Sequence, residues 1–188
     1  MKRIFFVLSL FVLSLASCTA CNDTVNPPCN GTGCSTLSTS SITSSDIESD
    51  ASNFQSLSGD SWEVFIPNEW VVKTPTSKIK GLEFLYFNNI SQSVILLIKE
   101  KTLVSLEEYS LETLRGLRDA GAKLNVAKQV KLNDKEFILL DSSREEITAW
   151  TWVTVHNGYA YTFSCSGLSV TQTQEDTCKS IVNTLKIK

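Results

Sequence analysis

Cysteine and histidine are the side chains of this sequence with the clearest chemical potential, and their spacing limits what they can do. The chain of 188 residues holds six cysteines and one histidine. Four cysteines come early, with the spacing C-x2-C-x7-C-x4-C, and two come late: Cys18, Cys21, Cys29, Cys34, Cys165 and Cys178. Thiolates at such intervals bind structural zinc in cytosolic proteins. In an oxidising compartment the same residues form disulfides instead.

The start of the chain has the order of charge and hydrophobicity that is typical of an export signal. Two basic residues precede the apolar run Ile4–Leu15, which is long enough for a signal core and too short to span a bilayer. The run ends in Leu-Ala-Ser-Cys, which resembles the bacterial lipobox, where small residues precede a cysteine that is acylated before cleavage. We therefore predict a signal peptide over residues 1–17 and lipidation of Cys18. The alternative is an ordinary secretory signal cleaved after Ala20, in a frame that lacks the usual Ala-x-Ala pattern.

Lipidation predicts where the protein resides. Two or more acyl chains hold a protein at a membrane almost permanently. Thr19, and not Asp, follows the lipidated cysteine, so the inner-membrane retention signal of some Gram-negative bacteria is absent. The expected location is the extracytoplasmic face of a bacterial cell envelope, with the outer membrane favoured if the source is Gram-negative. We expect contact with the membrane through the N-terminal lipid anchor.

An extracytoplasmic location changes the prediction for the other early cysteines. With Cys18 lipidated, too few thiolates remain for a four-coordinate zinc site, and we predict no metal and no cofactor. Cys29 and Cys34 enclose Asn-Gly-Thr-Gly, a flexible loop that suits a local disulfide. Cys21 is then the odd thiol, which either pairs with another chain or stays free.

The two late cysteines are related by a predicted hairpin. Asn157-Gly158 is a strong signal for a two-residue turn, because a type I′ turn needs positive φ at both positions. Such a turn places His156 opposite Tyr159, and one face of the hairpin then carries Trp150, Trp152, Thr154, His156, Tyr159, Tyr161, Phe163 and Cys165. Cys178 lies on the apolar stripe of the helix that follows. We predict a Cys165–Cys178 disulfide that clamps this helix to the sheet; two buried unpaired thiols are the alternative.

Aromatic residues and the histidine form the candidate binding surface: Trp70, Trp150, Trp152, His156 and Tyr159. Tryptophan stacks on sugars and peptides, although such residues more often form the core. Any Ser-His-Asp or Cys-His scheme must use His156, whose place beside a tight turn is typical of a surface histidine. The neighbouring carboxylates Glu107/Glu108 and Glu145/Glu146 fit a helix cap and a loop, and their adjacency gives no sign of an acid and a base held across a cleft. We therefore predict no catalytic residues.

A tether and one domain must position these residues. Residues 35–58 contain 13 Ser or Thr in 24 positions, and such a stretch buries too little apolar surface to offset its ordering entropy. We predict a flexible tether over residues 18–60 and a folded domain over residues 61–188. Apolar patterning predicts strands and two helices there, with the first helix opened by a Ser105/Glu108 capping box. The expected elements are strands at 62–66, 70–74, 82–87, 94–101, 126–132, 137–141, 147–156 and 159–166, and helices at about 105–120 and from about 173.

The order of these elements resembles the PsbP-like family. The residues that carry the likeness are Trp62-Glu-Val-Phe-Ile-Pro-Asn-Glu-Trp70, the helix opening Ser-Leu-Glu-Glu, the turn Lys-Leu-Asn-Asp-Lys-Glu-Phe at 131–137, the aromatic hairpin and the closing helix. The family includes bacterial lipoproteins of the DcrB type. The resemblance implies an α+β fold, an α/β/α sandwich around an antiparallel sheet. It also implies a binding or assembly role without enzymatic activity.

Two functions are compatible with these observations. The first is a lipid-anchored binding or assembly module whose partner is a protein of the envelope. The second is an extracytoplasmic small-ligand carrier or minor hydrolase with an edge pocket near His156. The formal net charge of −3 excludes a broadly basic nucleic-acid binder, and we predict no nucleic-acid partner.

Overall fold

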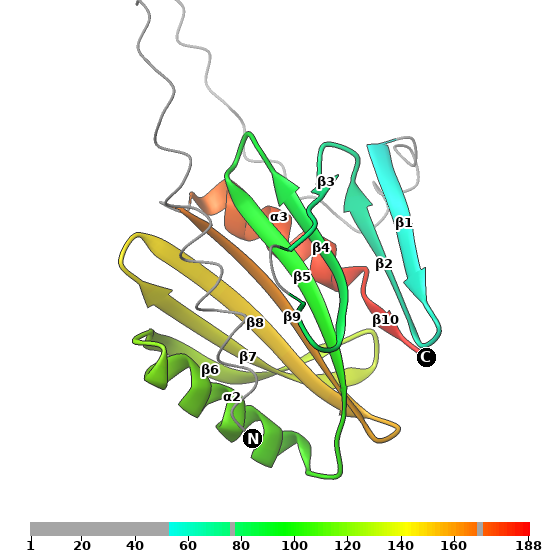
Figure 1. Ribbon diagram of the computed structural model, residues 1–188, viewed down its shortest axis with the longest axis vertical. Coiled ribbons are helices and arrows are strands. Elements are labelled where there is room, and N and C mark those ends of the chain that lie inside the picture. Colours follow the sequence, from blue (N-terminus) through cyan, green and yellow to red (C-terminus); the bar gives the residue numbers. More distant parts are fainter. Residues whose placement is uncertain (1–52, 76–77, 169–170) are drawn as a thin grey trace, which may run out of the picture.

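The computed structural model describes residues 53–75, 78–168 and 171–188. The predicted signal peptide, the lipidation of Cys18 and the Cys29–Cys34 disulfide lie outside these residues. Two antiparallel sheets and two helices make up the described part of the chain (Figure 1). The α+β class and the sandwich around an antiparallel sheet are confirmed.

A seven-stranded antiparallel sheet is the centre of the domain. Its strands lie in the order β3 (Val71–Val72), β4 (Leu82–Asn88), β5 (Ser93–Lys101), β9 (Tyr159–Leu168), β8 (Ile147–His156), β7 (Lys135–Arg144) and β6 (Lys123–Leu132). Tight turns connect β6 to β7 and β8 to β9, with positive φ at Asn133 and Asp134 and at Asn157 and Gly158. These residue types adopt positive φ at little cost, which is why short turns form there.

The second sheet begins within the range that we predicted as tether. It has three strands in the order β1 (Phe54–Gly59), β2 (Trp62–Pro67) and β10 (Lys186–Ile187). The folded domain therefore starts before residue 61, and the tether prediction is wrong for residues 54–59. The serine-rich composition misled the prediction, because β1 is held by ladder hydrogen bonds to β2 and not by a large apolar face of its own.

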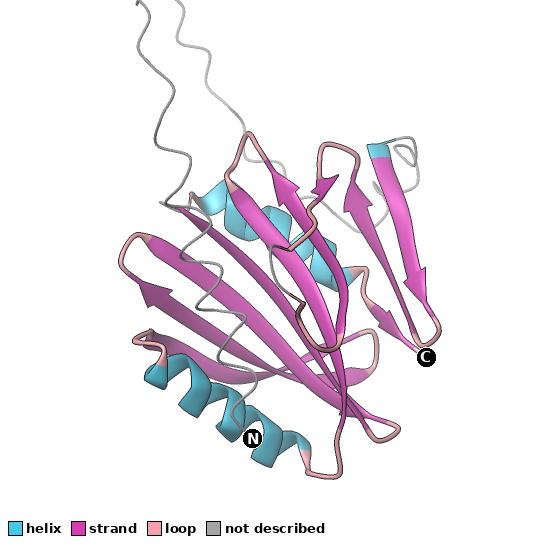
Figure 2. Cartoon of the chain, in the orientation of Figure 1, coloured by secondary structure: helices cyan, strands magenta, loops and turns pink. Residues whose placement is uncertain are grey.

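Helices cover opposite faces of the large sheet (Figure 2). α2 (Leu106–Asp119) contacts β6, β7 and β8, whereas α3 (Gln172–Asn183) contacts β9 and β2 on the other side. Both helices begin with a complete capping box, Ser105 with Glu108 and Thr171 with Gln174. The first box was predicted. The second places the start of α3 at Gln172, one residue before the predicted position.

The main core lies between α3, the small sheet and the inward face of the large sheet. It contains the predicted apolar stripe of α3 and the aromatic face of the hairpin: Trp150, Trp152, Tyr161, Phe163, Cys165, Cys178, Ile181, Val182 and Leu185. A smaller cluster joins Tyr109 of α2 to Val153 of β8 and Ala160 of β9. The alternation of side chains along β8 explains this division, since successive residues of a strand point to opposite faces.

The hairpin register and the late disulfide are confirmed. His156 pairs with Tyr159 and Trp150 pairs with Cys165, as a two-residue turn requires. Cys165 on β9 is bonded to Cys178 on α3, and their Cα atoms are 5.9 Å apart. The bond joins two residues of the main core and attaches the helix covalently to the sheet.

Candidate functional site

The structure separates the aromatic residues that we predicted as one binding surface. Trp150 and Trp152 are 5% and 3% exposed and belong to the main core, so neither offers a ring face to a ligand. His156 and Tyr159 lie at the turn between β8 and β9. Trp70 shares a pocket with Ser93 at the other end of β5, and the strand from Ser93 to Lys101, which pairs with Tyr159, is about 26 Å long at ~3.3 Å per residue. The prediction that all five residues form one surface is wrong. The alternation of side chains along β8 buries Trp150 and Trp152, and the length of the sheet separates Trp70 from the other two residues.

His156 and Tyr159 are engaged with neighbouring lysines. The Lys135 ammonium lies 3.1 Å from the His156 Nε2 atom, and the Lys99 ammonium lies 4.6 Å above the Tyr159 ring. Among the described residues, Lys135 is the side chain that bonds to the His156 ring, and no ion pair joins His156 to a carboxylate.

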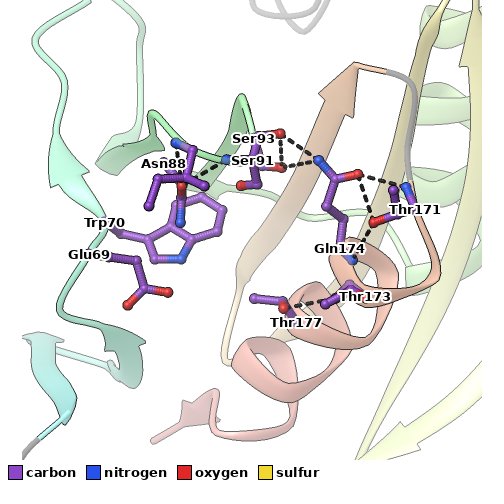
Figure 3. Close-up of a pocket in the computed structure, with 10 residues that line it drawn as sticks. Glu69, Trp70, Asn88, Ser91, Ser93, Thr171, Thr173, Gln174 and Thr177 are labelled. Atoms are coloured by element: carbon purple, nitrogen blue, oxygen red, sulfur yellow. Dashed lines mark hydrogen bonds between the residues drawn. The ribbon is translucent and has the colours of Figure 1, made fainter. Parts of the chain in front are cut away.

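A pocket lies at the opposite end of the sheet. Its volume is about 550 Å³, within the range of small-molecule sites. It lies between the segment before β3, the turn that joins β4 to β5, and the first turns of α3 (Figure 3). The described lining residues are Glu69, Trp70, Asn88, Ile90, Ser91, Ser93, Thr171, Thr173, Gln174 and Thr177.

Two amide side chains hold the walls of the pocket in place. Asn88 Oδ1 accepts the backbone N–H groups of Ile90 and Ser91 at 2.9 and 3.0 Å, which fixes the β4–β5 turn. Gln174 reaches across from α3: its Nε2 atom donates to the Ser91 carbonyl, and its Oε1 atom accepts the Thr171 N–H at 2.7 Å. Since Gln174 completes the helix cap and binds the turn at once, the two walls form one hydrogen-bonded unit.

The strand predicted at residues 70–74 is shortened to β3. The backbone bonds that exclude Trp70 from the strand also place it in the wall of the pocket. The Trp70 backbone N–H donates to the Pro67 carbonyl at 3.1 Å, and its carbonyl accepts from Gln55 at 3.0 Å. These bonds hold Trp70 in a turn before β3 instead of in the ladder. Its side chain is 2% exposed and lies beside Glu69 in the wall of the pocket (Figure 3).

The indole N–H of Trp70 has no acceptor within the described part of the chain. A buried donor without a partner costs about 1–3 kcal/mol, and such groups are rare in folded proteins. By contrast, the Trp62 indole donates to the Glu83 carboxylate at 2.8 Å. Figure 3 shows the Trp70 ring beside Glu69, on the side of the pocket opposite the residues of α3. The wall of the pocket therefore contains a buried donor whose hydrogen bond is not satisfied by the described residues.

The electrostatic character of the pocket is weak and mixed. Among the described lining residues Glu69 is the one with a charge, and it is exposed. The positive end of the α3 dipole faces the same space. No group of three or more metal-binding side chains is found among the described residues. Neither described helix has the length and apolar character that crossing a membrane requires.

Comparisons with known proteins show the fold and no family. No protein-family model matches this chain, and no curated protein matches it significantly. The solution structure of cyanobacterial PsbP (CyanoP) from Synechocystis sp. PCC 6803 is similar, with a TM-score of 0.57 and 16% identity. The similarity covers 79% of this chain and 98% of that one. A crystal structure of a protein of unknown function from Pseudomonas aeruginosa has a TM-score of 0.50 and 11% identity, over 72% of this chain and 98% of that one.

The PsbP-like fold is thereby confirmed. Sequence reasoning found one member of the pocket, Trp70, and missed the rest. A Thr-x-x-Gln pattern at 171–174 would have indicated the capping box of α3. No sequence signal relates it to the β4–β5 turn, because that contact joins residues more than 80 positions apart.

Proposed function

We propose that this protein is a lipid-anchored binding module on the extracytoplasmic face of a bacterial cell envelope, without a catalytic step of its own. Lipidation at Cys18 is the attachment, as in lipoproteins of the DcrB type, and its partner is an envelope component. The proposal combines the sequence of the leader with the geometry of the domain.

One observation carries the proposal: the wall of the pocket is a helix that a disulfide holds to the sheet. α3 supplies Thr173, Gln174 and Thr177 to the pocket and Cys178 to the bond with Cys165. Structural disulfides form in oxidising compartments, which supports an exported protein. A covalently held wall also limits rearrangement on binding, and preorganisation lowers the cost of association.

The composition of the pocket supports binding over catalysis. Acyl or phosphoryl transfer needs a nucleophile with an adjacent base, or a metal. The single imidazole of the chain, His156, is at the far end of the sheet, and Glu69 is the one titratable side chain among the described lining residues. The alternative of a hydrolase with a pocket near His156 has no such feature in its favour.

The lipid anchor is tested by intact mass and fractionation of the full chain. The wild-type chain is expected to lose residues 1–17, gain the mass of acyl chains and remain with the membranes. Cys18→Ser is expected to abolish the added mass. Cys21→Ser is the matched control, since it removes a thiol three residues away and leaves acylation unchanged. A wild-type chain without lipid that fractionates as a soluble protein contradicts the anchor.

Binding is tested in cells by photo-crosslinking from the rim of the pocket. Ile90 lines the pocket and is 89% exposed, so a photo-reactive amino acid at position 90 samples what approaches it. Position 103 is the control, because Leu103 is 98% exposed and follows Thr102, whose backbone N–H donates to Gly158 in the distant β8–β9 turn. We expect a defined adduct from position 90 alone. Equal labelling from both positions, or none, contradicts a binding role for this pocket.

A further inference from the structure

We propose that the pocket beside α3 binds an uncharged sugar unit, and that the indole N–H of Trp70 donates a hydrogen bond to one of its oxygen atoms. The inference rests on the proposed function, because it names the chemistry of the component that the binding module recognises. It is carried by the buried donor, the charge of the wall and the shape of the pocket.

The charges of the wall favour an uncharged ligand over an ionic one. An anion would lie against Glu69, and the described lining residues include no Lys, Arg or His to compensate. A cation would meet a single carboxylate together with an N–H donor and the positive end of α3. Both arrangements place like charges or dipoles together, whereas an uncharged ligand avoids this repulsion.

Hydrogen bonding then selects a ligand that both accepts and donates. Trp70 supplies an N–H without an acceptor in the described residues. The Asn88 side-chain oxygen is already used by two backbone amides, so its NH₂ group is the part that remains for a ligand. The Glu69 carboxylate can only accept. Sugar hydroxyl groups act as donor and acceptor at once, and adjacent hydroxyls can therefore satisfy a wall that mixes these groups.

The shape of the pocket also suits a sugar unit. A volume of about 550 Å³ is far larger than a water or an ion needs and small for a folded partner. Ile90 offers an exposed apolar side chain at the rim, which can contact the C–H face of a sugar ring. The Gln174 bridge between the two walls keeps these groups at fixed positions before the ligand arrives.

The Trp70 indole N–H is itself the reporter for the test. In ¹⁵N–¹H spectra of the full chain extracted in detergent, the indole signals are assigned by Trp→Phe variants. Chitotriose and cellotriose are then titrated as neutral probes. We expect saturable movement of the Trp70 indole signal with at least one of them. Trp70→Phe keeps an aromatic ring, removes the donor and is expected to weaken binding about tenfold.

Trp62→Phe is the matched control. It removes a buried indole N–H that bonds to Glu83 and does not line the pocket, so it tests for a general loss of stability. Binding by the Trp62→Phe chain is expected to remain at the wild-type level. Equal weakening in both variants overturns the role of Trp70.

Other outcomes overturn the proposal in different ways. Movement of the Trp70 signal with inorganic phosphate or acetate, and not with sugars, assigns an anion site. The Trp70 signal could instead respond to pH and not to any sugar. If Glu69→Gln removes that pH response, Glu69 is the internal acceptor of the indole N–H, and the proposal fails. Each of these outcomes overturns the sugar site alone. The proposed function is tested separately by acylation at Cys18 and by crosslinking from position 90, and it fails only if those two experiments fail.

Discussion

Removal of the Cys165–Cys178 disulfide provides a quantitative test of how α3 is held. Cys165 and Cys178 are 0% and 2% exposed and lie in the main core. Alanine is the replacement of choice, because serine would bury an unpaired hydroxyl. The perturbation removes a covalent link between α3 and β9 and two buried sulfur atoms.

The magnitude follows from the length of the closed loop. The cysteines are separated by 13 positions, and the chain-entropy relation for a loop of this length gives about 3 kcal/mol at 25 °C. Loss of the buried sulfur atoms adds a packing cost, so the Cys165→Ala/Cys178→Ala chain is expected to lose about 3–5 kcal/mol. The wild-type chain after reduction keeps its sulfur atoms and is expected to lose about 3 kcal/mol alone.

Urea unfolding monitored by tryptophan fluorescence measures both losses. A loss of 3 kcal/mol corresponds to a fall in the urea midpoint of about 1.5–2 M for a domain of this size. Cys29→Ala/Cys34→Ala is the control, because our sequence prediction places that pair in the tether, and its midpoint is expected to match the wild type. Amide exchange is expected to accelerate in α3 and not in α2, which contacts the opposite face of the sheet.

Two results would refute this reasoning. A double variant within about 1 kcal/mol of the wild type would mean that packing alone holds α3. Equal acceleration of exchange in α2 and α3 would mean that the link stabilises the whole domain uniformly and does not act on the pocket wall.

Three further predictions concern other parts of the domain. The pKa of the Tyr109 hydroxyl is raised by its burial and, secondarily, by the nearby Glu100 carboxylate, to which it donates at 3.0 Å. Because the unfolded hydroxyl ionises near pH 10, its contribution to stability is complete below that pH and is lost as the pH rises further. Tyr109→Phe is expected to cost about 1 kcal/mol at about pH 7 and less at about pH 11; a gap that widens with pH contradicts this. Ser105→Ala removes the cap of α2 and is expected to cost about 1 kcal/mol in urea unfolding, whereas glycine at 105 costs a few tenths. Gly81→Ala is expected to lower the melting temperature more than Gly121→Ala. Both glycines have positive φ, but a Cβ at position 81 would overlap the Lys99 carbonyl. Equal thermal shifts in the two variants would exclude that overlap as the cause.

Much of the fold was accessible from local patterns. The Ser105/Glu108 capping box, the Asn157-Gly158 turn and the Cys165–Cys178 pair were all predicted, because a turn or a cap is stabilised by residues within a few positions of each other. The register of β8 and β9 followed from the turn alone. The spacing on the final helix then placed the second cysteine.

Strand β1 marks where this reasoning stops. Its sequence offers one apolar side chain to the main core, Leu57, and the burial of its residues alternates only between exposed and intermediate. The backbone hydrogen bonds to β2 hold it in place, and these depend on the partner strand and not on the composition of β1. Composition therefore assigned residues 54–59 to the tether.

The sequence by itself determined the cap of α2, the cysteine spacing and the two-residue turn, because each is a property of residues close together in the chain. Only the tertiary structure decided that Trp150 and Trp152 are core, that His156 is far from Trp70, and that Trp70 meets Asn88 and Gln174 around one pocket. The physical reason is that antiparallel pairing and helix packing bring together segments that are distant along the chain. The cost of an unpartnered indole N–H can be recognised only once its surroundings are known.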